Sequence, residues 1–406
     1  MWWGVGMILS ADRQTLGAAV VRKAAILIGG AAAAMLGVSS AAQAQCAITG
    51  LPVQIQGLNM AGSLPASIST SVTTAGTVFL TQTTAFVASP QATQPGQFAG
   101  GIWIRGVGGS VDVDSSAAGN FAAATVVGPI NGTFSCTSRT KSTYGGFQAG
   151  ADIGRLDIGG WNVHVGVTGG YLSMSNKTGT AKVDFDVPFV GMYAAATNGG
   201  FYIDAQVRYD FYDMSLTDST LALTGRGLNA QGWGITASTG YIFTVGSVII
   251  EPSVGVVYSS VSVDPLTFAA PVVIPTPLPT ALAVTGTINM RDIETLLGRA
   301  GIRFATNATV GNLAVQPFVA ASVWHEFADD LTGNYRCVQP CGAPILTNLS
   351  ATATGDRIGT FGQYSIGFAA SVPNTPWLGY LRFDYRKGSQ IEGINFNGGI
   401  RYQFAP

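Results

Sequence analysis

Strict alternation of apolar and polar residues is the feature that most limits how this chain can fold. From Phe201 to Tyr212 the odd positions read Phe, Ile, Ala, Val, Tyr, Phe and the even positions read Tyr, Asp, Gln, Arg, Asp, Tyr. A period of two predicts a β-strand, because a helix repeats every 3.6 residues. The segment is about twice as long as the strands of roughly five or six residues that are usual in soluble sheets.

The same alternation recurs in twelve segments along residues 98–406. A tilted membrane strand needs about 9–11 residues, and these segments are long enough. Short turns alternate with four longer connections, a pattern typical of outer-membrane barrels with short periplasmic turns and long external loops. The sequence therefore predicts an all-β fold, a twelve-stranded antiparallel transmembrane β-barrel. The segments are 98–112, 142–155, 160–175, 181–197, 200–215, 228–244, 247–263, 284–306, 311–328, 355–372, 377–387 and 391–404, and the longer connections are 113–141, 216–227, 264–283 and 329–354.

Composition excludes several other classes of protein. Hydrophobic residues make up 47% of the chain and charged residues only 10%, whereas soluble domains carry about 25% charged residues. The apolar residues are dispersed, which excludes an ordinary helical membrane protein beyond the N-terminus. A net charge of −1 gives no strong attraction for nucleic acid. A soluble β-sandwich is the alternative fold, but it explains neither the strand length nor the strand count.

The first 44 residues resemble a secretory signal peptide in their layout. Arg22 and Lys23 precede an apolar run from Ala24 to Val38, and small residues follow up to Ala44. This order of basic, apolar and small residues predicts cleavage after Ala44 and export into an oxidising compartment. The alternative is a membrane anchor, but the apolar run is too short to span a bilayer stably.

The polar face of each predicted strand must point into the lumen. An Arg or Lys facing lipid at mid-bilayer costs about 2–4 kcal/mol, so charged residues within the strands are expected inside, where they hydrate the pore. Their signs are mixed, which allows them to pair and argues against strong ion selectivity. The predicted lumen residues are Arg105, Asp152, Asp204, Arg208, Asp210, Glu251, Arg299, Arg303, Arg382, Asp384 and Arg401.

Short sequence phrases carry a resemblance to a known family. The last strand, Asn397–Phe404, resembles the C-terminal signal of bacterial outer-membrane barrels, which implies that Gly399, Tyr402 and Phe404 are read by the barrel-assembly machinery. Four further phrases resemble the translocator domain of autotransporters, the type V secretion proteins. They are Gly101–Gly106, Gly146–Gly150, Gly298–Phe304 and Trp324–Phe327. The resemblance implies a twelve-stranded barrel with a helix threaded through its pore and an N-terminal passenger carried outward.

The place of the passenger holds only a short segment here. Residues 45–64 are interpreted as a passenger remnant and residues 65–97 as the pore helix and a linker. Within 65–88, Val72, Ala75, Phe79, Thr83 and Phe86 fall on one side at helical spacing, which favours a helix. The alternative is a disordered periplasmic tail. No Asn-Asn pair occurs in 65–97, so the self-cleavage known in some relatives is not expected.

The four cysteines suggest disulfides without fixing their pairing. Cys337 and Cys341 are four residues apart in a predicted external loop, which suits a local disulfide. A half metal site is the alternative, but no second ligand pair lies nearby in the sequence. Cys46 and Cys136 can pair if the N-terminal segment reaches the cell surface. Four cysteines allow three pairings, which the sequence leaves open.

Catalysis and cofactors find little support in the residues. The chain has two His, His164 and His325; alternation places the first in the lumen and the second on the outer face. No Gly-x-Ser-x-Gly elbow is present. We therefore expect neither an enzyme nor a cofactor.

The leading hypothesis is an outer-membrane autotransporter-type barrel that translocates or displays its own short N-terminal segment at the cell surface. Its expected partners are outer-membrane lipid and the barrel-assembly machinery, without nucleic acid. We expect a monomer, because a single-chain barrel closes its own edges. A passive pore, or a surface adhesin acting through loops 113–141 and 329–354, is the alternative.

Overall fold

The computed structural model describes residues 45–49, 56–79, 96–125, 128–274, 280–338, 341, 346–373 and 375–404. The predicted signal peptide lies outside these residues. The described residues form one helix, α2 (Gln56–Val78), and nineteen strands of one sheet.

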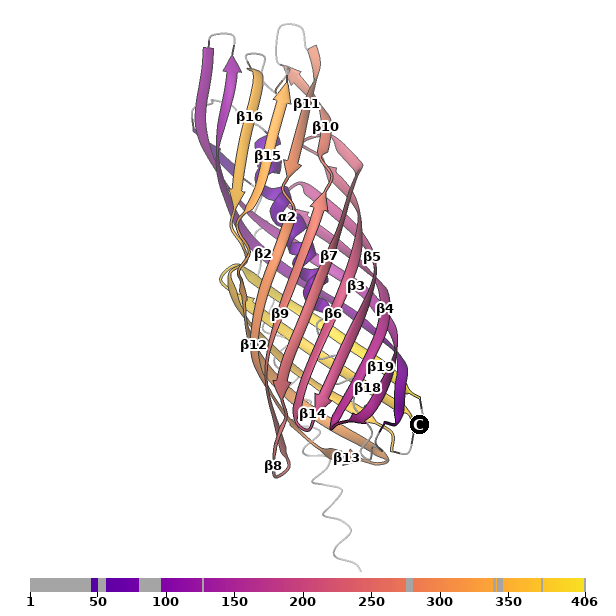
Figure 1. The fold of residues 1–406 in the computed structure, drawn as a ribbon. Helices are drawn as coiled ribbons and strands as arrows, with labels where there is room; N and C mark the ends of the chain where they lie inside the picture. Colours follow the sequence, from indigo (N-terminus) through magenta and orange to yellow (C-terminus); the bar gives the residue numbers. More distant parts are fainter. Residues whose placement is uncertain are drawn as a thin grey trace, which may run out of the picture. The chain divides into compact units, whose positions relative to one another are not determined.

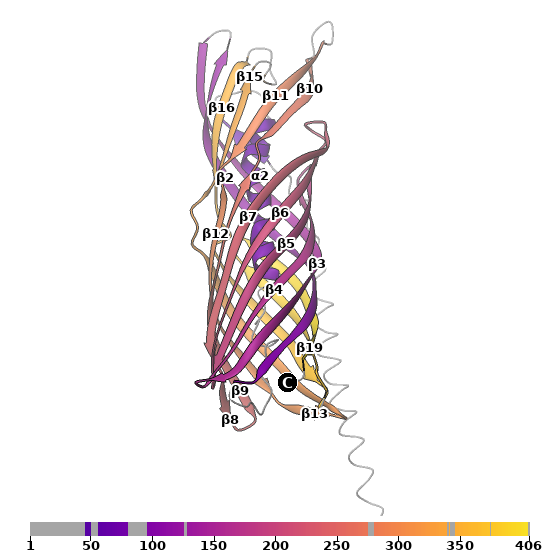
Figure 2. The same ribbon diagram turned by 45° about the vertical axis from the view of Figure 1, so that its right-hand side comes forward.

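Twelve long strands form a closed antiparallel ring around α2 (Figures 1 and 2). The ring closes where the last strand pairs with the first, with Tyr402 opposite Ile102. The predicted twelve-stranded barrel is therefore confirmed, and closure leaves the ring without a free edge. Its strands are β2 (Phe98–Thr125), β3 (Gly128–Ile158), β4 (Trp161–Thr178), β5 (Ala181–Asn198), β6 (Phe201–Asp218), β7 (Leu223–Tyr241), β9 (Val248–Val263), β12 (Ile293–Thr306), β14 (Leu313–Glu326), β17 (Thr360–Ser371), β18 (Trp377–Gly388) and β19 (Ile391–Gln403).

One end of the barrel carries tight hairpin turns. Gly159 and Gly160 join β3 to β4 with φ values of 62° and 86°, the left-handed region that glycine enters without steric cost. Two short strands, β8 (Phe243–Val245) and β13 (Ala308–Val310), extend hairpins at this end, where the C-terminus also lies (Figure 1). We call it the short-turn end.

At the opposite end, three of the four predicted loops are largely β-structure. Strands β2 and β3 pair without interruption up to Thr125 and Gly128, so residues 113–141 are a continuation of the hairpin. The segment predicted as one strand, 284–306, is divided between β11 and β12. The strands that replace the predicted loops are β10 (Leu266–Ile274), β11 (Thr280–Met290), β15 (Leu331–Val338) and β16 (Leu346–Gly355).

These strands join into a sheet that continues the barrel wall. Strand β11 pairs with β15, β15 with β16, and β16 with β2. The first described strand, β1 (Gln45–Ile48), pairs with β3 on the other side. We call β1, β10, β11, β15, β16 and residues 114–139 of β2 and β3 the outer extension.

Helix α2 differs from its predicted bounds. It begins at Gln56 instead of Pro65 and ends at Val78; residues 80–88 lie outside the described part of the chain. Pro65 lies inside the helix, where its ring opposes a normal bond to the carbonyl of Ala61. Strand β15 packs closely at this point, because a Cβ added to Gly333 would lie 2.6 Å from the oxygen of Ala61. No described helix is long and apolar enough to cross a membrane.

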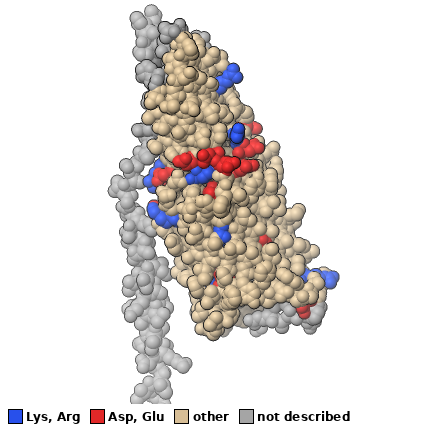
Figure 3. Space-filling model, turned by 60° about the vertical axis from the view of Figure 1, so that its left-hand side comes forward, with Lys and Arg blue, Asp and Glu red and all other residues tan. Residues whose placement is uncertain are grey.

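The outer surface of the barrel is apolar. Figure 3 shows charged side chains gathered in a band across one face, with a broad surface below it that carries few charges. Large apolar side chains are exposed along the strands, an arrangement that suits lipid and would promote aggregation in water. Examples are Val167 (63%), Met192 (64%), Val323 (57%), Ile366 (52%) and Phe396 (54%).

We expect an arginine to be destabilising on this surface in proportion to its depth. Ile366 lies midway along β17, so Ile366→Arg should cost about 2–4 kcal/mol in a bilayer. Val310, 63% exposed at the short-turn end, is the matched control, and Val310→Arg should cost only about 0–1 kcal/mol. Urea unfolding in lipid vesicles, followed by gel mobility without boiling, measures both. Equal costs would contradict the proposed membrane position.

Candidate functional site

The C-terminal end of α2 lies among polar side chains of the barrel wall. A helix leaves its last carbonyls unbonded and its C-terminus partly negative, and α2 has no basic residue in its last turn. The wall supplies the donors: Arg208 Nη2 donates to the carbonyl of Ala75 at 2.8 Å. Asn397 Nδ2 donates to the carbonyl of Val78 at 3.1 Å, and Arg105 donates to that of the next residue, Phe79. The wall therefore supplies hydrogen-bond donors to carbonyls at the end of the helix, and the helix supplies acceptors to side chains of the wall.

Hydroxyl groups along α2 make further contacts with the wall. Asn176 Nδ2 lies 2.7 Å from the carbonyl oxygen of Ser67 and 2.9 Å from Ser71 Oγ. Arg386 Nη1 donates to Thr77 Oγ1 at 3.1 Å. Serine and threonine lower helix propensity, but here their side chains match a polar wall.

Oppositely charged side chains pair throughout the lumen wall. Burying an unpaired charge has a large desolvation cost, and an oppositely charged partner offsets much of it. Mixed signs leave the lumen without one dominant charge. The pairs and their shortest nitrogen–oxygen distances are Arg208–Asp210 (2.6 Å), Arg303–Glu251 (2.6 Å), Arg382–Asp384 (2.5 Å) and Arg401–Asp152 (2.6 Å).

The eleven charged residues predicted to line the lumen all lie away from the exposed outer face. Nine are at most 8% exposed, and Arg299 and Arg303 are partly buried. They bond one another and uncharged residues of the wall, such as Gln148, Ser238 and Ser253, and Arg105 and Arg208 also bond carbonyls at the end of α2. A role in hydrating an open pore stays a prediction. The prediction omitted Arg386, although it shares a strand face with Arg382 and Asp384. It also omitted Asn176 and Asn397, whose amides resemble those of ordinary polar wall residues in the sequence.

Asp152 is the centre of a dense polar cluster below the helix. Arg401 binds both of its carboxylate oxygens, at 2.6 and 2.7 Å. Tyr193 donates to Asp152 Oδ2 at 2.7 Å, and Trp103 Nε1 donates to the Tyr193 hydroxyl at 2.6 Å. His164 Nδ1 lies 3.1 Å from Asp152 Oδ1. His164 is thus a buried wall residue on the inner face.

His325 lies on the opposite face. It is exposed, its ring centroid lies 4.5 Å from that of Phe327, and its Nδ1 lies 2.6 Å from Thr360 Oγ1. Within the described ranges, no three His, Cys, Asp or Glu residues are grouped as a metal ion would require.

The residues of the C-terminal signal lie where the ring closes. Gly399 is opposite Arg105 of β2, and the ring of Tyr402 lies 5.0 Å from that of Trp377. The amide of Phe404 donates to the carbonyl of Gly100 at 2.9 Å. Recognition of these residues by the assembly machinery stays a prediction.

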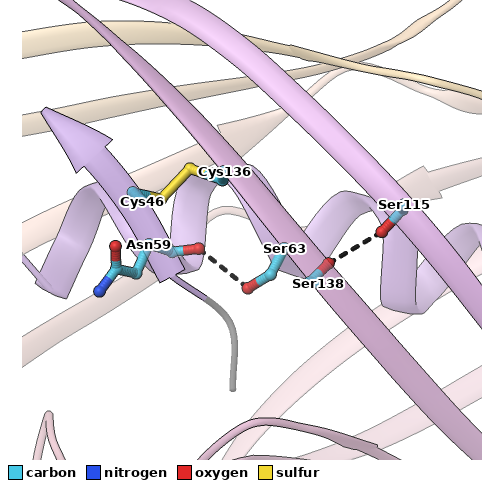
Figure 4. The surroundings of a disulfide bond; sticks show 6 residues. All are labelled: Cys46, Asn59, Ser63, Ser115, Cys136 and Ser138. Atoms are coloured by element: carbon cyan, nitrogen blue, oxygen red, sulfur yellow. Dashed lines mark hydrogen bonds between the residues drawn. A yellow bond between two sulfur atoms is a disulfide. The ribbon is translucent and has the colours of Figure 1, made fainter. Parts of the chain in front are cut away.

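All four cysteines are paired in the structure. Cys337 of β15 bonds Cys341, which lies between β15 and β16. Cys46 of β1 bonds Cys136 of β3 (Figure 4). Cys46 and Cys136 are each 4% exposed. Figure 4 shows this bond beside α2, near Ser63.

The space between helix and wall is small beside Gly76. A cavity of about 20 Å³ lies beside Gly76, lined by Arg208, Val257 and Ser259 among others. This is close to the space that one water molecule needs. The described helix therefore packs tightly against this part of the wall.

Comparison with known proteins agrees with this geometry. The model of the autotransporter β-domain matches residues 102–336. The probable autotransporter YcgV of Escherichia coli K12 is 25% identical over 318 residues, which are 75% of this chain and 28% of that protein. The chain thus spans little more than a quarter of the length of this relative.

Two solved structures are similar. The transport unit of the autotransporter AIDA-I from Escherichia coli has a TM-score of 0.56 at 16% identity, covering 84% of this chain and 98% of that chain. It shares the fold. The β-domain of the Bordetella autotransporter BrkA has a TM-score of 0.49 at 19% identity, covering 75% and 98%. Because the family model matches more than half of its length, the chain belongs to the autotransporter β-domain family and forms a translocator-type barrel of the bacterial outer membrane.

Proposed function

We propose that this barrel displays its own short N-terminal segment at the cell surface and that α2 closes the lumen behind it. The observation that carries the proposal is the position of β1. It pairs with β3 in the outer extension, with Cys46 opposite Cys136, at the end of the barrel away from the short turns. Outer-membrane barrels direct short turns to the periplasm, so β1 belongs outside.

The displayed segment is shorter than the sequence suggested. Because α2 begins at Gln56, only residues 45–55 precede it in the mature chain, instead of a passenger remnant 45–64. Residues 56–97 then serve as the pore helix and linker, and residues 98–406 as the barrel. The segment is a remnant that the barrel retains, and we propose no cleavage from it.

Closure, assembly and the absence of catalysis belong to the same proposal. A passive pore needs a free lumen, whereas α2 is bound to the wall through Arg208, Asn176 and Asn397. The ring has no free edge, which supports a monomer inserted by the assembly machinery through its C-terminal strand. Asp152 is bound by Arg401 as well as by His164, and the bonds described for this pair include no serine or cysteine nucleophile. This supports a protein without enzymatic activity.

An epitope placed within residues 50–55 should bind antibody on intact cells. The same epitope inserted at Gly311, in a short turn, is the matched control and should bind only after the outer membrane is permeabilised. Flow cytometry with and without permeabilisation measures both, while gel mobility without boiling verifies that each barrel has folded. Binding at residues 50–55 only after permeabilisation would sink the proposal.

Arg208→Met should loosen the helix within the lumen. The variant removes a charged hydrogen bond to the carbonyl of Ala75, an interaction worth about 1.5–3 kcal/mol. The open fraction in planar-bilayer recordings should rise roughly ten- to hundredfold. Arg303→Met is the matched control, because Arg303 pairs with Glu251 and Gln316 on the wall. If both variants open the pore alike, the helix is not held as proposed.

Adhesion is a second candidate function, favoured by the outward face of the outer extension. One row of side chains crosses five strands in register: Asn289, Asn334, Thr352, Asn120 and Thr133. All carry uncharged amides or hydroxyls, and they line a shallow hollow of about 730 Å³. Groups that both donate and accept hydrogen bonds suit the hydroxyls of a neutral glycan.

Replacing the two exposed amides, Asn120→Ala with Asn289→Ala, should lower retention of expressing cells on immobilised neutral glycans several-fold. The reason is loss of four donors and two acceptors from the row. Asn229→Ala, an exposed asparagine of β7 outside this row, is the control and should leave retention unchanged. Equal retention of all three cell populations would rule out adhesion through this face.

A further inference from the structure

The disulfide between Cys46 and Cys136 is enclosed by the finished barrel. Each cysteine is 4% exposed. On one side lies α2, so close that a Cβ added to Gly62 would fall 2.8 Å from Cys136 Sγ. Within the sheet, Cys136 lies opposite Ala117 of β2. On its other side it lies opposite Cys46 of β1 (Figure 4). The bond thus joins β1 to β3 and is covered by α2.

Forming this bond requires access to the sulfurs. A thiolate attacks a disulfide of an oxidant in line, and the second cysteine then resolves the mixed disulfide. Two cysteine thiols give up two electrons and two protons, and the disulfide of the oxidant becomes a dithiol. A thiol oxidase of the exporting compartment is the oxidant, and it must touch a sulfur to react. Once α2 has docked at Gly62, that contact is blocked.

We propose that the Cys46–Cys136 bond forms in the periplasm, before the barrel is complete, and ties the mature N-terminus to the β2–β3 hairpin. The inference rests on the proposed display of the N-terminal segment. Cys136 lies in the outer half of β3, which must itself cross the membrane. A tie made beforehand delivers β1 together with this hairpin, so that the N-terminus needs no separate passage through a finished pore.

Sequence separation makes the tie long-range. The bond links residues 90 positions apart, and the closed loop contains all of α2, all of β2 and the beginning of β3. The second disulfide links residues only four apart and ties no separate segments together. The chain thus carries its own control, a disulfide in the outer extension with no such role.

The test is to ask which form of the protein first carries the bond. A protease site placed in residues 80–95 separates Cys46 from Cys136 after cleavage. Cells depleted of barrel-assembly machinery accumulate the periplasmic precursor, which is acid-quenched, alkylated with N-ethylmaleimide, cleaved and run on non-reducing gels. We expect the two fragments to stay joined in the precursor. Free, alkylated Cys46 and Cys136 in the precursor, with the bond appearing only in folded barrels, would overturn the inference.

A second measurement follows delivery itself. In Cys46→Ser, Cys136→Ser and the double variant, the surface signal from an epitope in residues 50–55 should fall several-fold and equally, while the signal from an epitope inserted in residues 342–345 should not change. Changing Cys337 and Cys341 to Ser is the control and should leave delivery unchanged. Undiminished delivery without the tie would overturn this role. If the epitope of the wild type is at the cell surface but the disulfide forms only in the folded barrel, this inference is wrong and the proposed function stands. If the epitope of the wild type is on the periplasmic side, the proposed function is wrong as well.

Discussion

Hydrogen bonds from arginines of the barrel wall to carbonyls at the C-terminal end of α2 fix the position of the helix in the lumen. A helix that ends inside a lumen leaves several backbone carbonyls without a hydrogen bond, and a buried arginine on the inner wall needs a hydrogen-bond acceptor. Arg208 and Arg105 meet both needs at once, each bound to a helix carbonyl and to a wall partner. Helix position and wall charge therefore depend on one another: without the helix, Arg208 and Arg105 would each lose a carbonyl acceptor.

That arrangement explains why a helix so rich in serine and threonine is stable here. Its sequence has weak intrinsic helix propensity, and it lacks charged residues at both ends. In water such a segment would gain little from folding. In the lumen, Asn176 and Arg386 donate hydrogen bonds to hydroxyl groups of the helix, and the side chains of Val72 and Leu58 are buried. Contacts with the wall stabilise the helix over a longer range than the helical spacing of apolar residues indicated, so it begins at Gln56 and not at Pro65.

Sequence alternation predicted the membrane part of the fold because lipid and lumen impose opposite demands on alternate residues. Phe201–Tyr212 shows both demands and falls within one ring strand. The same rule failed in the outer extension, where one face meets water and the other meets α2, so small polar residues such as Ser135 and Thr352 are accepted on the outer face. Inward-facing charges could be predicted for the same reason. The roles of Asn176 and Asn397 could not, because both depend on the position of the helix that they bind.

The outer extension changes what the short N-terminal segment can do. In a barrel with free loops, residues 45–48 would be an untethered tail. Here they add an edge strand to a sheet that β2 and β3 already carry beyond the membrane, and the covalent tie at Cys136 makes the addition permanent. The extended hairpin of β2 and β3 and the strand β1 thus form one surface. Because β1 is paired with β3 and bonded to it by a disulfide, the proposed display would present the extended hairpins of the barrel together with the N-terminal segment.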